Sequence, residues 1–264
     1  MDFTISPRIE DFRRRIARFV QDELLPVEED RANYDPHENI RLDLLEALRD
    51  KARAEGLWCL QLKQETGGQD LGRVGMAVCY EEMNRSIFGP VVFNSAAPDD
   101  GNMMVLNRLG TPEQKERWLA PIARGDVRSA FAMTEPAPGG GSDPSMIRTF
   151  ARREGDRYVV EGRKWFITGA EAARHFILIA RTSDDPRNGL TAFLFHADQP
   201  AGVARPDRCD QFIHVVSHCA PASRPLLPYA PVFPSPREGR AVTRIDIRDG
   251  PGKALSSRGE WCER

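Results

Sequence analysis

A glycine-rich stretch between two strand-like segments carries the residue types in this chain that are best suited to chemistry. It reads FAMTEPAPGGGSDPSMIRT, from Phe131 to Thr149, and sets three consecutive glycines between the hydroxyls of Thr134 and Ser142. Glycines let backbone N–H groups approach a phosphate closely, because no Cβ stands in the way. The stretch lacks the Gly-Lys-Ser/Thr of a P-loop and the spacing of a GxGxxG turn. It indicates either a phosphate-binding loop of another kind or a flexible hairpin loop.

A second segment, GRKWFITGA, follows further along the chain and carries two adjacent aromatic rings, Trp165 and Phe166, with the hydroxyl of Thr168 close behind. Aromatic faces stack on planar rings, and hydroxyls bind ring nitrogens and oxygens. In a strand one of two adjacent rings faces the core, so packing alone accounts for one of them. Together the two segments predict a site for a planar heterocyclic cofactor that carries a diphosphate.

The elements that must position these segments change character along the chain. Helical spacing dominates the first half, in two apolar stripes: Ile9, Phe12, Ile16, Phe19 and Val20, then Leu42, Leu45, Leu48 and Ala52. We expect Pro26 to end the first helix and Gly56 to cap the second. Thr111 and Gln114, with Pro112 between them, have the sequence of a capping box that starts a further helix.

Short runs rich in aromatic and β-branched residues begin near Val127 and are separated by turn signals: SAFAMT, RYVVEGRKWFIT, HFILIART and LTAFLFH. They predict an antiparallel barrel or sandwich of short strands. Eight of the 20 prolines lie after Arg205 and disfavour helices and central strands there. The predicted fold class is α+β: an all-helical N-terminal domain over residues 1–127, a small antiparallel β-barrel domain over 128–204, and an irregular Pro-rich tail over 205–264.

Composition and charge argue against several classes of protein. The formal net charge of −2 gives no basic field that would attract nucleic acid. No apolar run approaches the roughly 20 residues that a membrane-spanning helix needs, and the N-terminus does not resemble a signal peptide. The five cysteines show no CxxC spacing, and the five histidines show no metal-ligand spacing. We expect a cytoplasmic protein with reduced thiols, no metal site, no membrane span and no nucleic-acid partner.

FAMTEPAPGGGSD followed by GRKWFITGA resembles the flavin-binding segments of the acyl-CoA dehydrogenase family. LGTPEQKERWLAPIARGDVRSAFAMTEP resembles the family's last N-terminal helix and its entry into the β domain, and APDDGNMMVLNRLG is similar to the branch acting on long or unusual acyl chains. The resemblance covers roughly residues 5–204 and implies FAD as the cofactor. The cofactor-binding residues that it implies are Phe131, Met133, Thr134, Gly141, Ser142, Phe166 and Thr168.

The resemblance also implies individual roles. Phe131, Met133 and Thr134 would line the isoalloxazine ring, with Thr134 near its pyrimidine edge. Ser142 would meet the pyrophosphate or the thioester end of the substrate. Phe166 takes the position usually held by a tryptophan beside the flavin, and Thr168 would contact the flavin near N5, where a hydrogen bond stabilises the reduced form. The loop between Pro136 and Asp143 looks longer than the usual family version.

The family oxidises an acyl-CoA to the enoyl-CoA, removing a proton from Cα and a hydride from Cβ, and passes electrons to an electron-transfer flavoprotein. Its members form homo-oligomers, and their catalytic base is a glutamate of a C-terminal helical bundle. The last sixty or so residues of this chain resemble no such bundle, so no catalytic residue is assigned. Glu135 has a structural role on this reading, and Glu238 and Glu260 lie in the Pro-rich tail.

These features suggest a truncated or frame-altered, inactive family member. Two alternatives stay open: a non-catalytic flavin- or acyl-CoA-binding or interaction module, and a flavoenzyme similar to the acyl-CoA oxidases.

Overall fold

The computed structural model describes residues 4–35, 39–141, 143–154, 157–185, 189–197, 245–248 and 255–256. The described residues divide into two units. The first contains residues up to Asn107 together with Ala123–Gly125, and the second contains Arg108–Ile122 and the residues from Asp126 onward.

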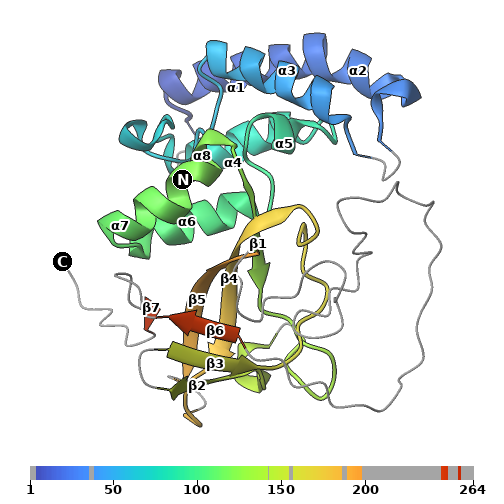
Figure 1. Cartoon of the computed structure of the whole chain (residues 1–264). Helices are drawn as coiled ribbons and strands as arrows, with labels where there is room; N and C mark the ends of the chain where they lie inside the picture. The colour runs from blue at the N-terminus through green and yellow to red at the C-terminus, as the bar shows by residue number, and fades with distance from the viewer. Residues whose placement is uncertain are drawn as a thin grey trace. The chain divides into compact units, whose positions relative to one another are not determined.

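The first unit is helical (Figure 1). Its elements are α1 (Pro7–Phe19), a π-helical turn (Val20–Leu24), α2 (Leu25–Glu29), a 3₁₀ turn (Arg31–Asn33), α3 (Leu42–Ala54), a 3₁₀ turn (Gln64–Thr66), α4 (Gly72–Met83), α5 (Gly89–Val92) and α6 (Asp99–Leu109), whose end crosses into the second unit. Gly56 has a φ of +64° directly after α3 and its cap residue, which confirms the predicted glycine cap.

The prediction that Pro26 ends the first helix is wrong. The chain stays helical to Glu29, because Val20–Leu24 widens into a π-helical turn before the proline. Pro26 then falls in the first turn of α2, where the N–H group that proline lacks is least needed.

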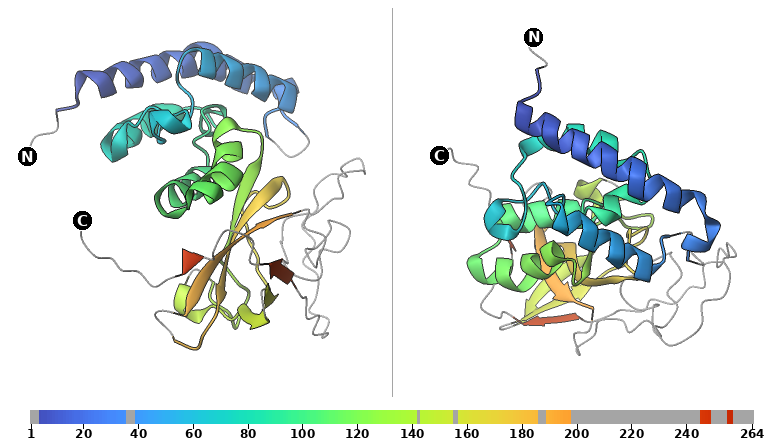
Figure 2. Two further views of the ribbon diagram at one scale, coloured as in Figure 1. Left: turned by 60° about the vertical axis from the view of Figure 1, so that its left-hand side comes forward. Right: turned by 90° about the horizontal axis from the view of Figure 1, so that it is seen from above.

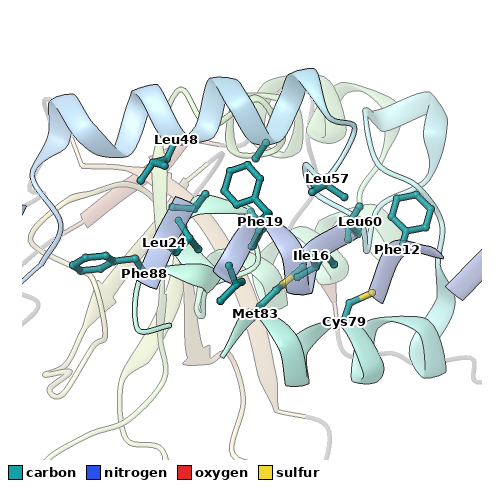
Figure 3. Close-up of a cluster of buried hydrophobic side chains, with 14 of the residues drawn as sticks. Phe12, Ile16, Phe19, Leu24, Leu48, Leu57, Leu60, Cys79, Met83 and Phe88 are labelled. Atoms are coloured by element: carbon teal, nitrogen blue, oxygen red, sulfur yellow. The ribbon is translucent and has the colours of Figure 1, made fainter. Parts of the chain in front are cut away.

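The core of the first unit contains the residues of both predicted stripes that face inward. Figure 3 shows side chains from α1, α3 and α4 gathered between these helices, including Phe12, Ile16, Phe19, Leu48 and Met83. Burial of this apolar surface is what turns the helical periodicity of the sequence into a packed unit.

The second unit combines a short helical segment with a curled sheet. The helical elements are α7 (Pro112–Gln114), a π-helical turn (Lys115–Leu119) and α8 (Ala120–Arg124), of which Ala123 and Arg124 belong to the first unit. The predicted capping box is confirmed: the Gln114 N–H donates to Thr111 Oγ1 at 3.2 Å, and the Thr111 N–H donates to Gln114 Oε1 at 3.0 Å.

Among the described residues, seven strands form the sheet: β1 (Arg128–Ala132), β2 (Phe150–Glu154), β3 (Arg157–Glu161), β4 (Ala173–Arg181), β5 (Leu190–His196), β6 (Ile245–Arg248) and β7 (Leu255–Ser256). The order is β6-β3-β2-β4-β5-β7, with β1 paired to β4. The long strands β4 and β5, yellow to orange in Figure 2, are antiparallel along their whole register from His175–His196 to Arg181–Leu190.

The predicted fold class, a helical domain followed by a small β domain, is confirmed, but the sheet is not purely antiparallel as predicted. The sheet is mixed, because β1 runs parallel to β4, from Ser129–His175 to Ala132–Leu178. A parallel pair needs a crossover of about a dozen residues or more, and the long segment between Ala132 and Ala173 supplies it. That crossover contains both segments singled out in the sequence.

Two further strands lie inside the segment predicted to be an irregular tail, since β6 pairs with β3 and β7 with β5. The rest of residues 205–264 lies outside the described residues. Within the described ranges, no helix has the length and apolar character needed to cross a membrane.

Candidate functional site

The two predicted cofactor-binding segments are joined side by side in the second unit. The Trp165 N–H donates to the Thr134 carbonyl at 3.1 Å, and the Thr134 hydroxyl donates to the Trp165 carbonyl at 2.5 Å. The chain leaving β1 therefore runs against the chain that follows β3. This contact brings the residues predicted on the first segment next to those predicted on the second.

Both segments contain buried residues with half-buried or exposed residues between them, so that part of each is available to a ligand. In β1, Ala130 and Ala132 are buried, while Phe131 is only half-buried. Met133, the residue directly after β1, is also half-buried. Since successive strand residues point to opposite faces, Phe131 and Met133 share one face.

In the second segment Lys164 and Ile167 are buried, and Phe166 and Thr168 are exposed. Five of the seven predicted cofactor residues thus lie on these two joined segments with side chains that are half-buried or exposed.

Phe166 has two unusual properties. Its backbone lies in the left-handed region with a φ of +50°, and its side chain is 64% exposed. A non-glycine residue in this region is uncommon and costs about 1–2 kcal/mol. The Phe166 ring lies 4.6 Å, centroid to centroid, from the Trp165 ring. A strained, exposed aromatic residue is typical of a ligand-contacting position that the surrounding structure holds in place.

The strain at Phe166 gives a direct prediction. A Phe166→Gly variant should be more stable than a Phe166→Ala variant by about 1 kcal/mol, because only glycine adopts a positive φ without strain. Both variants lose the exposed ring equally. Urea unfolding of the two proteins, followed by circular dichroism, measures the difference. Equal stability, or a more stable alanine variant, would show that residue 166 carries no backbone strain.

The two threonine hydroxyls differ in what they can offer. Thr134 donates its single proton to the Trp165 carbonyl, so toward a ligand its oxygen is left as an acceptor. Thr168 is exposed, and no hydrogen bond from its hydroxyl to a described residue is observed. Its hydroxyl can both donate and accept.

The turn after Thr134 is organised by the buried carboxylate of Glu135. Its Oε1 accepts from the Thr149 N–H at 2.9 Å and from the Thr149 hydroxyl at 2.5 Å, and its Oε2 accepts from the Arg148 N–H at 2.8 Å. Oε1 also accepts from the Lys164 ammonium at 2.8 Å. With these donors in place Glu135 is a structural carboxylate, as the sequence suggests.

Lys164 carries the opposite charge in the same buried place. Its Nζ donates to Glu135 and also to the Met133 carbonyl at 2.8 Å, and its exposed fraction is 0%, against 3% for Glu135. Burial raises the pKa of the Glu135 carboxyl, but the pairing with Lys164 and the donors Thr149 and Arg148 outweigh it, so that the pKa lies below its usual value. Burial lowers the pKa of Lys164, and Glu135 opposes that shift.

Gly139, the first of the three consecutive glycines, has a clear structural requirement. A Cβ at this position would lie 2.5 Å from Glu135 Oε2, so only glycine leaves room for the carboxylate. Gly141, predicted to bind cofactor, is exposed and has a φ of +46° with open space around it. Ser142, predicted to meet the pyrophosphate or the substrate, lies outside the described residues, as do Glu238 and Glu260.

Lys164 is a part of this site that the sequence did not indicate. A lysine next to Arg163 resembles any solvent-facing residue, and nothing in the sequence marks it as buried. Among the described residues, no three histidine, cysteine, aspartate or glutamate side chains form a group that could hold a metal ion.

Comparison with known proteins identifies the family. Residues 6–126 match the model of the acyl-CoA dehydrogenase N-terminal domain, and residues 130–211 match that of the acyl-CoA dehydrogenase middle domain. The chain belongs to the acyl-CoA dehydrogenase family.

Individual relatives agree with this assignment. The chain is 38% identical over 191 residues to "Probable acyl-CoA dehydrogenase FadE2" of Mycobacterium tuberculosis. The aligned region covers 70% of this chain and 46% of the relative.

Two solved structures extend the likeness to the fold. A Mycobacterium abscessus protein assigned to the acyl-CoA dehydrogenases is 36% identical with a TM-score of 0.67, over 75% of this chain and 52% of that one. The FAD complex of PigA is 28% identical with a TM-score of 0.64, over 76% and 51%. The chain therefore spans about half the length of these relatives.

Proposed function

We propose that residues 131–142 and 162–169 bind FAD and that the protein takes part in the FAD-dependent oxidation of an acyl-CoA to the enoyl-CoA. The observation that carries the proposal is the joining of the two segments by the paired hydrogen bonds between Thr134 and Trp165. It brings an exposed aromatic ring, half-buried apolar side chains and hydroxyls to neighbouring stretches of chain.

The residues present suit a flavin. Phe131, Met133 and Phe166 offer apolar and aromatic surface to a planar ring system. The Thr134 oxygen, left as an acceptor, suits the N–H at the pyrimidine edge of the flavin, and the Thr168 hydroxyl suits a contact at N5. Gly141 and Ser142 are proposed to meet the pyrophosphate, and Ser142 also the thioester end of the substrate. The PigA structure, which is an FAD complex, supports this choice of cofactor.

When bound, FAD supplies a two-electron acceptor. The chain's own residues orient the ring system and exclude water from one of its faces. We assign no general base among the described residues, since the Glu135 carboxylate is already bound by four donors. An acyl-CoA as substrate, an electron-transfer flavoprotein as electron acceptor, a homo-oligomer and a cytoplasmic location are parts of the same proposal, as are the domain limits at 127/128 and 204/205.

The test is an absorption spectrum of the purified protein before and after incubation with FAD and removal of free cofactor. We expect the bands of a protein-bound oxidised flavin to be retained, and to be lost in a Thr168→Val/Phe166→Ala variant with unchanged circular dichroism. A colourless wild-type protein that takes up no FAD would refute the proposal. If FAD is retained, turnover of acyl-CoAs with an artificial acceptor or with oxygen separates a dehydrogenase, an oxidase and a module that binds flavin without turnover.

A further inference from the structure

We propose that Glu135 and Lys164 are positioning residues for the flavin: their buried ion pair holds the two cofactor-binding segments in register, and does so as a function separate from stabilising the fold. The inference rests on the proposed FAD binding. Neither side chain is offered as a contact with the cofactor, since both are buried beneath the segments that would touch it.

Three hydrogen bonds join the two segments at one place. Lys164 donates to the Met133 carbonyl, the Thr134 carbonyl accepts from Trp165, and the Glu135 carboxylate accepts from Lys164. Three consecutive residues of one segment are thus bound to two consecutive residues of the other. A slip of one residue would break all three ties at once, so that the register between the segments is unique.

The Glu135 carboxylate also holds the far end of the glycine-rich stretch in place. Glu135 accepts from the Arg148 and Thr149 N–H groups and from the Thr149 hydroxyl. The glycine-rich loop is thereby closed at its two ends by a single side chain. Gly139 packs against the same carboxylate, which links the position of the loop to that of the ion pair.

The ion pair also fixes the start of the stretch that contains the exposed ligand-contacting residues. Phe166 and Thr168, the exposed residues proposed to touch the flavin, follow Lys164 by two and four positions. Phe166 holds a strained backbone, which persists only where the flanking chain is fixed. Lys164 and Trp165 supply that fixed end through their bonds to residues 133–135.

Stability alone does not account for such a pair. Apolar residues of similar volume often stabilise a fold as well as a buried ion pair does, because both charges must be removed from water. Hydrogen-bonded charges have stricter geometry than apolar contacts, and a ligand-contacting group must be held to within about 0.5 Å. The arrangement fits a requirement for position.

The experiment separates position from stability with a double substitution. In Glu135→Gln/Lys164→Met both buried charges are removed, so the fold is not left with an unpaired one. We expect the double variant to regain most of the unfolding temperature that Lys164→Met loses. Its dissociation constant for FAD, measured by flavin fluorescence titration, should still rise about 10- to 100-fold, the range typical for residues that orient a ligand-contacting group. Glu23→Gln/Lys51→Met, at an exposed pair, is the matched control and should bind FAD as the wild type does.

A second pair of variants applies if the double variant does not fold. Thr149→Val removes one donor to Glu135, and Thr191→Val removes a buried hydroxyl that bonds to Thr182 elsewhere in the same sheet. Both cost one hydrogen bond at a buried threonine, so similar losses of stability are expected. Only Thr149→Val should weaken FAD binding.

The outcomes are decisive in each case. Wild-type affinity in the double variant, or equal affinities in the two threonine variants, would overturn the positioning role. The wild-type titration comes first: if the wild type takes up no FAD, the proposed function itself fails. If the wild type and the folded variants all bind FAD equally, the cofactor assignment stands and only the role of Glu135 and Lys164 is refuted.

Discussion

Replacing Lys164 alone with methionine is expected to lower the free energy of unfolding by about 3–5 kcal/mol, the typical cost of leaving one member of a buried ion pair without its partner. The carboxylate of Glu135 would keep the Thr149 and Arg148 donors but lose its counter-charge at 3% exposure. The Met133 carbonyl would also lose its donor. Urea unfolding followed by tryptophan fluorescence would measure the loss.

The control for this variant is Lys51→Met. Lys51 pairs with Glu23 at 2.6 Å, a distance at least as short as in the buried pair, but both side chains are exposed to solvent. Pairs of this kind contribute about 0–1 kcal/mol. Similar losses in the two variants would show that burial adds nothing at Lys164, contrary to the structure.

A Phe93→Ala variant is expected to lose about 3–5 kcal/mol of stability in the helical unit, the usual range for a large aromatic residue removed from a core. Phe93 has an exposed fraction of 0%, and its ring packs edge-on against that of Phe19 at 5.2 Å between centroids. Its backbone carbonyl, which accepts from the Cys59 N–H, is unaffected by the change. Chemical unfolding followed at 222 nm reports on this unit, because the helices are concentrated there.

Leu42→Ala is the matched control from the same unit. Leu42 belongs to the apolar stripe expected from the sequence, yet it is 71% exposed at the first turn of α3. Its removal should change stability by less than about 0.5 kcal/mol. A loss of stability comparable to that of Phe93→Ala would mean that a residue contributes to the free energy of unfolding through its place in the apolar stripe and not through its burial.

Helices were the more predictable part of the fold because their signals are local. The stripe from Ile9 to Val20, the glycine after α3 and the capping box at Thr111 each depend on residues within a few positions of one another. The prediction for Pro26 was wrong for the same reason. The rule that a proline ends a helix takes no account of a π-helical turn before the proline. The parallel pairing of β1 with β4 could not be inferred from local pattern, because it joins residues far apart in the sequence.

The candidate site shows the same division. The residue types at Phe131, Met133, Thr134, Phe166 and Thr168 indicated a planar cofactor before any contact was known, and the structure brings their two segments together. The sequence did not indicate the buried ion pair of Glu135 and Lys164 that joins these segments. A lysine is normally exposed, so the sequence does not distinguish Lys164 from its neighbour Arg163. In the structure Lys164 is fully buried against Glu135, and Arg163 is exposed.

Glu135 holds both ends of the glycine-rich loop, and this determines which changes in length the fold tolerates. Because one carboxylate holds both ends of the stretch, residues added between Pro136 and Asp143 lengthen a loop whose ends stay in place. Doubling the length of such a loop costs only about 0.6 kcal/mol. A deletion of one residue between Lys164 and Thr168 would instead exchange buried and exposed positions. We therefore expect insertions and deletions among relatives between Pro136 and Asp143, and not between Lys164 and Thr168.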